Sequence, residues 1–293
     1  MSTRATGVVQ LNGRFVPSQR AQISVLDRGL LYGDGLFETL RAYQGRPFAL
    51  DAHLGRLQES ADFLGFVVPR RPWRRDIESL LKKNGFLASD AWVRITVTRG
   101  VGTRGLLPPA RPRPALMAMA GRLDPAIARV QRFGAHVALL PFARHGFLAE
   151  HKVLSYLPGV LGKVMAARHQ AFEGLFVNAD GFVTEGTTTN VFAWRGKRLS
   201  TPPIAGILPG ITRRMIIELA TADGIRVAEQ PLRVDDLLDA DEVFLTSSLA
   251  EVVPVTAVNA RNIGDGAVGR RTQHLQEVYR QMVDQDLAKR RRD

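Results

Sequence analysis

The chain is organised around the stretch HKVLSYLP, which occupies residues 151–158. Its single lysine, Lys152, stands among apolar neighbours, so we expect the ammonium group to be partly desolvated. Desolvation disfavours the charged form of lysine, and such a side chain can supply a neutral, nucleophilic amine near neutral pH. Pro158 fits the first turn of a helix, with apolar positions at Val160, Leu161, Val164 and Met165.

A second block, VTEGTTTNVF, occupies residues 183–192 and sets the carboxylate of Glu185 and a run of hydroxyls between apolar strand residues. Alone, Lys152 would be read as an ordinary surface lysine, because most lysines are exposed. A reactive lysine, a sequestered glutamate and clustered hydroxyls together are the groups that an enzyme using pyridoxal phosphate (PLP) needs. The two blocks therefore predict a PLP site.

Composition sets broad limits on the class of protein. With 293 residues, 45% hydrophobic and 23% charged, the chain can form one large or two medium-sized domains. No apolar run is long enough for a membrane span. The absence of cysteine excludes disulfides and thiolate catalysis and fits a cytoplasmic protein. The histidines show no close pair of the zinc-ligand type, so we expect no metal site.

The formal net charge of +12 invites comparison with nucleic-acid-binding proteins. The basic residues are scattered, however, apart from clusters at 70–75 and in the terminal run 289–292. No aromatic nucleic-acid-binding pattern accompanies them. We expect no nucleic-acid partner and no membrane partner, and interpret the charge as a field that attracts anionic substrates.

The first half of the chain carries several local signals. Asn12-Gly13 predicts a tight hairpin turn between residues 8 and 16. Gly33 and Gly35 around Asp34 indicate a close approach of two backbone segments. Because these glycines open a strand and not a helix, they do not form a dinucleotide-binding motif.

Residues 92–99 alternate, with Val93, Ile95 and Val97 on one face of a strand and Arg94 on the other. The polar face either meets solvent or lines a polar pocket. Arg56 is either a solvated helix residue or a phosphate anchor, since guanidinium groups pair well with phosphate oxygens.

We place an N-terminal domain at residues 1–121, a linker at 122–130 and a C-terminal domain at 131–293. In the second domain, the helix start at Ile211 and Thr212 offers backbone N–H groups that can bind a phosphate. Ser247 and Ser248 end a buried strand and either cap a turn or donate to the same phosphate.

Six ordered motifs together resemble the fold-type IV PLP enzymes, the class-IV aminotransferase family. This family includes branched-chain and D-amino acid aminotransferases and 4-amino-4-deoxychorismate lyases. The motifs are DRG…YGDGLFET (27–39), HxxRL (53–57), Lys152, EGTTTN (185–190), and GITR (210–213) followed by TSSxxEVxP (246–254). The resemblance implies an α/β (α+β) fold with two domains, an N-terminal α/β domain and a C-terminal pseudo-barrel domain, and a homodimer.

The resemblance also assigns roles to residues. Lys152 would carry PLP as an aldimine and act as the catalytic base, while Glu185 would face the pyridine nitrogen. Tyr156 would reach the phenolic oxygen of PLP, although core packing with an incidental hydrogen bond is an equal alternative. The remaining cofactor-binding residues implied are Arg56, Thr188, Ile211, Thr212, Ser247 and Ser248.

The substrates implied are an amino acid of the branched-chain or D type and a 2-oxo acid, contacted by Phe37, Arg94 and Arg104. Leu106 stands where D-amino acid enzymes carry a basic residue, and Phe37 stands where they carry a tyrosine. Thr39 and the Arg104-Gly105 loop are shared with the deoxychorismate lyases. Release of pyruvate and 4-aminobenzoate from aminodeoxychorismate is therefore the alternative activity.

Overall fold

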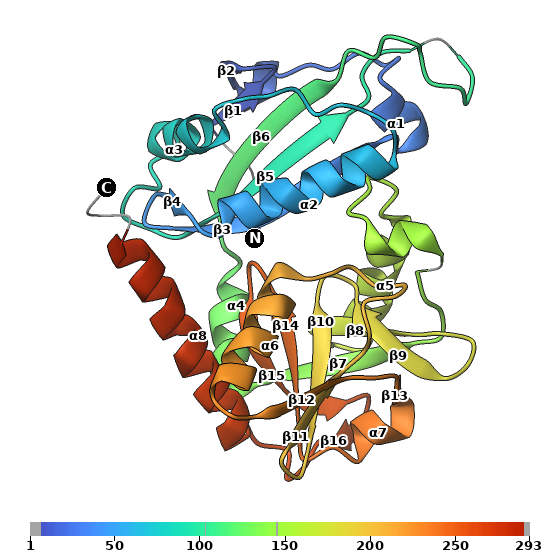
Figure 1. Cartoon of the computed structure of the whole chain (residues 1–293), viewed down its shortest axis with the longest axis vertical. Coiled ribbons are helices and arrows are strands. Elements are labelled where there is room, and N and C mark those ends of the chain that lie inside the picture. Colours follow the sequence, from blue (N-terminus) through green and yellow to red (C-terminus); the bar gives the residue numbers. More distant parts are fainter. Residues whose placement is uncertain (1–6, 103, 145, 290–293) are drawn as a thin grey trace. The chain divides into compact units, whose positions relative to one another are not determined.

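The computed structural model describes residues 7–102, 104–144 and 146–289. The chain divides into two compact units (Figure 1). Unit 1 comprises residues 1–124 and 151–155, and unit 2 comprises 125–150 and 156–293. Most of the basic terminal run lies outside the described residues. Among the described residues, no helix has both the length and the apolar character to cross a membrane.

Unit 1 is built on a six-stranded antiparallel sheet with the order β2-β1-β6-β5-β3-β4. Its strands are β1 (Val8–Leu11), β2 (Arg14–Pro17), β3 (Gly35–Tyr43), β4 (Arg46–Pro47), β5 (Ala91–Thr98) and β6 (Ala115–Arg122). Its helices are a 3-10 turn η1 (Ser18–Arg20), α1 (Arg28–Tyr32), α2 (Leu50–Phe63) and α3 (Trp73–Lys83).

Two local predictions for unit 1 are confirmed. Asn12 and Gly13 have φ angles of 49° and 84°, the left-handed pair that a two-residue hairpin turn requires. Val93, Ile95 and Val97 are fully buried on one face of β5, in the core that α2 and α3 cover (Figure 1). The opposite face of the sheet carries Arg94.

Unit 2 contains a ten-stranded mixed sheet with the order β12-β11-β10-β14-β15-β7-β8-β9-β13, and β16 pairs with β15. Because β9 also lies close to β10, the sheet curls as expected for the pseudo-barrel. Its strands are β7 (Ala135–Leu140), β8 (Glu173–Val177), β9 (Phe182–Gly186), β10 (Asn190–Arg195), β11 (Arg198–Thr201), β12 (Arg226–Glu229), β13 (Leu232–Arg233), β14 (Glu242–Ser247), β15 (Glu251–Val258) and β16 (Arg261–Asn262).

Helices of unit 2 pack against this sheet. They are α4 (Pro125–Phe133), a 3-10 turn η2 (Phe147–Glu150), α5 (Leu157–Arg168), α6 (Ile211–Ala222), α7 (Val234–Leu238) and α8 (Arg270–Lys289). Figure 1 shows α6 and α8 side by side; α6 contacts the strands β12 and β14, and α8 contacts β14 and β15.

Of the stretch 122–130, expected as an interdomain linker, residues 122–124 belong to unit 1, and residues 125–130 lie in helix α4 of unit 2. Ile127 and Gln131 are the buried residues of this helix, and Gln131 donates to the carbonyl of Ala250. The few apolar residues of the stretch fall on one helical face, which is enough to dock a short helix on a strand.

Helix α5 begins as predicted at Leu157-Pro158, but of its large apolar residues Met165 packs against the core while most of the others are exposed. Val160, Leu161 and Val164 are each about half exposed, whereas Gly159, Gly162 and Ala166 are buried. A β-carbon at Gly162 would lie 2.7 Å from Cδ1 of Leu140. The small residues thus allow close packing on the sheet, which apolar periodicity alone does not reveal.

Candidate active site

Lys152 lies on a short segment, residues 151–155, that joins unit 1 although its sequence neighbours belong to unit 2. The segment adds to the edge of β3, since Phe37 N donates to the carbonyl of Lys152 and Leu154 N donates to that of Gly35, both at 2.9 Å. A β-carbon at Gly35 would lie 2.7 Å from Leu154 Cδ1 and 2.5 Å from the Val97 carbonyl oxygen. The glycine motif therefore makes room for the lysine segment.

The structure brings Lys152, Phe37 and Arg94 together. The Lys152 ammonium nitrogen lies 4.6 Å from the centre of the Phe37 ring, and the Arg94 guanidinium carbon lies 3.7 Å from it. Phe37 is only 5% exposed, so both cations contact one buried aromatic ring. Arg94 also donates from Nε to Thr96 Oγ1 at 3.3 Å, which orients the side chain along β5.

Arg56 belongs to a buried ionic cluster with Glu38 and His53. Arg56 Nε donates to Glu38 Oε1 at 2.8 Å, and Arg56 Nη2 donates to Oε2 at 2.7 Å. His53 Nδ1 lies 2.7 Å from the same Oε2. The fork-like pairing fixes the plane of the guanidinium group. Glu38 and His53 were part of the sequence motifs, but sequence reasoning assigned them no role.

Burial and charge act in opposite directions on this cluster. Burial raises the pKa of Glu38, but the Arg56 guanidinium and the His53 hydrogen bond outweigh it and lower the pKa to about 2. For His53, burial lowers the pKa below its usual 6.5, and the positive charges of Arg56 and Lys152 add to this effect. Glu38 is therefore a carboxylate and His53 a neutral imidazole at pH 7.

Helix α2 also holds the start of the lysine segment. The His151 ring stacks on Phe63 with centres 4.1 Å apart, and His151 Nδ1 lies 3.2 Å from Ser60 Oγ. Because one helix contacts both the Glu38 side chain and His151, the backbone of Lys152 is fixed from two directions.

In unit 2, Glu185 is a buried carboxylate on β9 with donors on both oxygens. Arg144 Nη1 lies 3.1 Å from Oε1, and Leu208 N donates to Oε2 at 3.1 Å. Arg144, which follows β7, was not identified from the sequence. Its only signal is a basic residue in an otherwise apolar stretch, and that gives no indication of a partner 41 residues away.

The hydroxyls after Glu185 point at a second buried carboxylate that the sequence did not reveal, Glu173. Thr188 Oγ1 donates to Glu173 Oε2 at 2.8 Å, and Thr187 Oγ1 donates to Oε1. Tyr156 OH donates to the carbonyl of Thr187 at 2.9 Å. A phenol has one proton, so Tyr156 can meet a further polar group only as an acceptor.

Helix α6 begins at Ile211 after Gly210, which leaves the first backbone N–H groups without helical partners. Thr246, whose Oγ1 is buried and without a partner among the described residues, pairs in the sheet with Asn190. Asn190 in turn donates to the carbonyl of Leu208, just before α6. The Thr189 hydroxyl, in the block after Glu185, is buried and equally unpaired.

Unpaired buried hydroxyls and helix N–H groups are hydrogen-bond donors that a phosphate can satisfy. Ser247 follows Thr246 directly, and its Oγ accepts a hydrogen bond from Ala250 N at 3.1 Å. Ser248 lies in the turn that follows. The residues at this end of unit 2 therefore fit a phosphorylated cofactor.

Arg104, the second predicted substrate contact, is an exposed residue of a loop of unit 1, whereas Arg94 lies on β5. The neighbouring Leu106 and Leu107 are 81% and 86% exposed. The two candidate carboxylate-binding arginines thus differ in setting, one stacked on a buried ring and the other on a surface loop.

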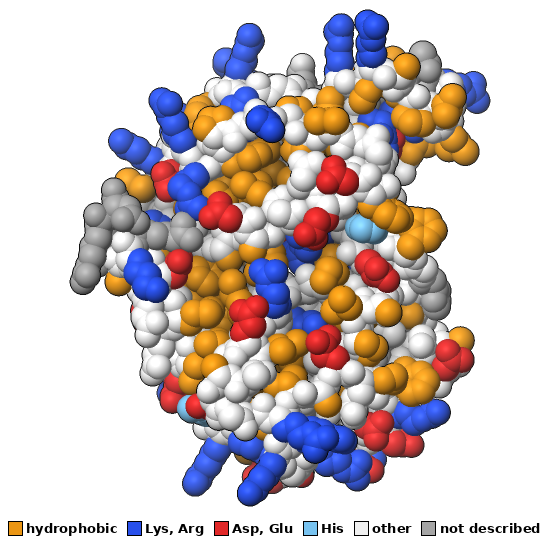
Figure 2. All heavy atoms as spheres, viewed as in Figure 1, with side chains coloured by type: hydrophobic (Ala, Val, Ile, Leu, Met, Phe, Trp, Pro, Cys, Tyr) orange, Lys and Arg blue, Asp and Glu red, His pale blue; other side chains and the backbone are white. Residues whose placement is uncertain are grey.

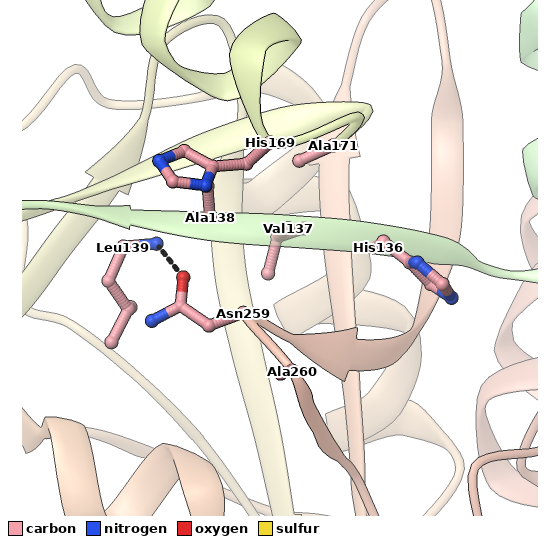
Figure 3. Close-up of a pocket in the computed structure, with 8 residues that line it drawn as sticks. All are labelled: His136, Val137, Ala138, Leu139, His169, Ala171, Asn259 and Ala260. Atoms are coloured by element: carbon pink, nitrogen blue, oxygen red, sulfur yellow. Dashed lines mark hydrogen bonds between the residues drawn. The ribbon is translucent and has the colours of Figure 1, made fainter.

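A pocket of about 440 Å³ lies elsewhere in unit 2, beside β7. Figure 3 shows the rings of His136 and His169 pointing apart, while Asn259 accepts a hydrogen bond from Leu139 N. None of the residues expected at the cofactor site lines this pocket.

Charged side chains form no single basic patch on the face shown in Figure 2. Lys and Arg side chains project at several places, with Asp and Glu between them. This distribution agrees with a scattered positive charge.

Comparison with known proteins agrees with the geometry. Residues 35–258 match the class IV amino-transferase family model. A putative branched-chain-amino-acid aminotransferase of Methanocaldococcus jannaschii is 38% identical over 93% of this chain and 95% of its own. The aminodeoxychorismate lyase of Bacillus subtilis is 32% identical, with 94% of each chain covered, and the D-alanine aminotransferase of Bacillus licheniformis is 32% identical, with 96% and 99% covered.

A solved structure has the same fold. A hypothetical aminotransferase from Mycobacterium tuberculosis, in its PLP-bound form, superposes with a TM-score of 0.82 and 27% identity, covering 92% of this chain and 96% of the other. The region matched by the family model begins at Gly35 and includes Lys152, Glu185 and the start of α6. The match thus runs from the glycine turn beside the lysine segment to the strand after Ser248. This chain belongs to the class IV aminotransferase family.

Proposed function

We propose that this protein transfers an amino group between an amino acid and a 2-oxo acid, with PLP as the cofactor and Lys152 as the lysine that holds it. The observation that carries the proposal is the placement of Lys152 and Arg94 on one buried aromatic ring. A lysine for proton transfer and a guanidinium for a carboxylate are the two groups that amino transfer requires close together.

The cofactor, when bound, supplies an electron sink for the carbanion that forms at the substrate Cα. In unit 2, the N–H groups of Ile211 and Thr212, with Thr246 and Ser247, would hold its phosphate. Glu185 would hold a proton at the pyridine nitrogen, because a carboxylate there favours the charged ring. Arg144 and Leu208 N keep that carboxylate in a fixed orientation.

In unit 1, Lys152 would move the proton away from Cα. Its main chain is fixed to β3 at Phe37, so the amine moves only through its own side-chain torsions. Arg56 would contact the phosphate while its Nε and Nη2 remain on Glu38. Arg94, or Arg104 from its loop, would bind the substrate carboxylate.

We further propose a homodimer. On α5, Leu157, Val160 and Leu161 are 65%, 55% and 50% exposed, and Leu30 on α1 is 60% exposed. Large apolar residues gathered on exposed helices favour burial against another chain. Light scattering behind a sizing column tests this, and a monomer at working concentration would contradict it.

The decisive experiment is an assay of L- and D-amino acids with 2-oxoglutarate or pyruvate as acceptors. We expect amino transfer with branched-chain L-amino acids or with D-amino acids. Release of pyruvate and 4-aminobenzoate from aminodeoxychorismate, with no transfer to any 2-oxo acid, would instead identify a lyase.

Borohydride reduction followed by peptide mapping tests the lysine separately. The cofactor should be fixed on Lys152. Lys163 is the matched alternative, but its Nζ already donates to the Phe172 carbonyl and lies 3.1 Å from Glu173.

A further inference from the structure

The motif around residues 27–34 contains a charge cluster in unit 1 that the proposed reaction does not use. The Asp34 carboxylate accepts hydrogen bonds from Arg28 Nε at 2.7 Å and from Arg99 Nε at 2.8 Å. Arg28 is 3% exposed and Arg99 is 6% exposed. One carboxylate thus anchors two buried arginines that reach in different directions.

Arg28 extends to the loop that carries Arg104. Its Nη1 donates to the carbonyl of Gly105 and its Nη2 donates to that of Leu106, both at 2.8 Å. Gly105 N donates to Tyr32 OH at 3.1 Å, and the Arg28 guanidinium lies 4.8 Å from the centre of the Tyr32 ring. The backbone just after Arg104 is therefore bonded from both its N–H and its carbonyl sides.

Arg99 uses the same carboxylate for a different segment. Its Nη2 and Nη1 donate to the carbonyls of Leu64 and Gly65, at 2.9 and 3.2 Å. These residues follow helix α2, far in sequence from Arg104. Arg99 is thus an internal control for Arg28, because it matches Arg28 in residue type, burial and anion.

We propose that Arg28 is a positioning residue that sets the conformation of the Arg104 loop and thereby the binding of the substrate carboxylate. The second part rests on the proposed function, in which Arg104 contacts substrate. Among the described residues of this loop, Leu106 and Leu107 are exposed and do not anchor it by burial. Its conformation therefore depends on hydrogen bonds from outside the loop, and Arg28 supplies two charge-assisted ones.

The first test measures the loop without reference to activity. Trypsin cleaves after Arg104, and cleavage requires the loop to open. Arg28→Met should release the 1–104 fragment about tenfold faster than wild type, because two charge-assisted hydrogen bonds are lost. Arg99→Met should leave this rate within about twofold, although it removes an arginine of equal burial. Equal cleavage rates in the two variants would overturn the proposal.

Tyr32→Phe serves if Arg28→Met does not fold. Tyr32 is 37% exposed, and the substitution removes only the hydroxyl that accepts the hydrogen bond from Gly105 N. It should accelerate the same cleavage severalfold without lowering the yield of folded protein. If Arg28→Met does not fold and Tyr32→Phe is cleaved at the wild-type rate, the proposal is contradicted.

The second test links the loop to substrate binding. Arg28→Met should raise KM for the 2-oxo acid about tenfold with a smaller change in kcat, and this increase should vanish in an Arg104→Ala background. Faster cleavage with an unchanged KM would refute the role in substrate binding. A wild-type protein without amino transfer would refute the proposed function, while the cleavage comparison would still decide whether Arg28 holds the loop.

Discussion

In unit 1, both oxygens of Glu38 are bonded to Arg56 or His53, whereas in unit 2 the buried hydroxyls of Thr189 and Thr246 have no partner among the described residues. The charges of the Glu38 cluster are compensated within unit 1, so the orientation of Arg56 is set without a ligand. Unit 2 keeps buried donors unsatisfied beside the residues that we assign to the phosphate.

This difference separates two physical roles. A buried ion pair with fixed geometry orients a side chain and makes its loss costly to folding. An unpaired buried hydroxyl lowers the stability of the protein without ligand. That cost is recovered when a ligand accepts a hydrogen bond from the hydroxyl. Mutations in the Glu38 cluster should therefore affect folding, and mutations at these hydroxyls should affect ligand binding.

The largest effect should come from the lysine itself. Lys152→Ala should reduce turnover by about 10²–10⁴-fold or more, because proton transfer at Cα loses its base. Its thermal stability should change little, since the segment is held by main-chain bonds. Lys163→Met is the control and should retain activity. Comparable losses of turnover in both variants would mean that Lys152 has been wrongly assigned.

Next in size is the carboxylate of unit 2. Glu185→Gln should lower the single-turnover rate about 10²–10³-fold, the range for loss of one stabilising electrostatic contact. The amide retains an acceptor for Leu208 N but removes the anion of Arg144, so the melting temperature should fall as well and the rate is compared per folded protein. A rate unaffected by the substitution would exclude a role for Glu185 in the chemistry.

In unit 1, Glu38→Gln should destabilise the protein by about 3–5 kcal/mol, because it leaves the Arg56 guanidinium buried without its anion. Denaturant unfolding measures this loss. The double variant Glu38→Gln/Arg56→Gln should regain part of it. If the double variant were as unstable as the sum of the single ones, the pair would not be coupled as the structure indicates.

Thr246→Val tests the role of the buried hydroxyls in unit 2. It removes a buried hydroxyl without a partner among the described residues, so the protein without cofactor should be unchanged or more stable by about 1 kcal/mol. Cofactor affinity should fall severalfold. The control is Thr201→Val, whose hydroxyl donates to the Val191 carbonyl at 2.8 Å. That variant should lose about 1 kcal/mol, and the same loss in Thr246→Val would show that its hydroxyl has a partner after all.

The smallest effect concerns pH. The pKa of His53 is lowered from 6.5 in the folded state, so below pH 6.5 the unfolded chain binds more protons at this site. Stability should therefore fall as the pH drops from 6.5 towards the folded pKa. The contribution of Glu38 is fully present above its unfolded pKa of 4.5 and is lost as the pH falls towards about 2.

His53→Gln isolates the upper window. Melting temperatures of wild type and variant should be compared from about pH 7 to about pH 5, where Glu38 contributes little change. The variant should show the flatter dependence. Identical slopes would mean that His53 does not carry the predicted titration.

Local sequence determined the elements and the chemical groups. Asn12-Gly13 set a hairpin because only certain residues adopt two successive left-handed conformations. Strict alternation predicted the buried face of β5, and the start of α6 followed from its glycine and apolar spacing. These signals act over a few residues, so they can be read without knowing the fold.

Only the tertiary structure decided the partners. Lys152 belongs to unit 1, although the residues on either side of segment 151–155 belong to unit 2. Arg144 pairs with Glu185, and Glu173 accepts hydrogen bonds from hydroxyls that were expected to face a cofactor. Likewise, α5 buries its glycines instead of its valines because close backbone packing outweighs apolar periodicity there. Such pairings join residues distant in sequence, and their energies depend on burial and geometry that exist only once the chain has folded.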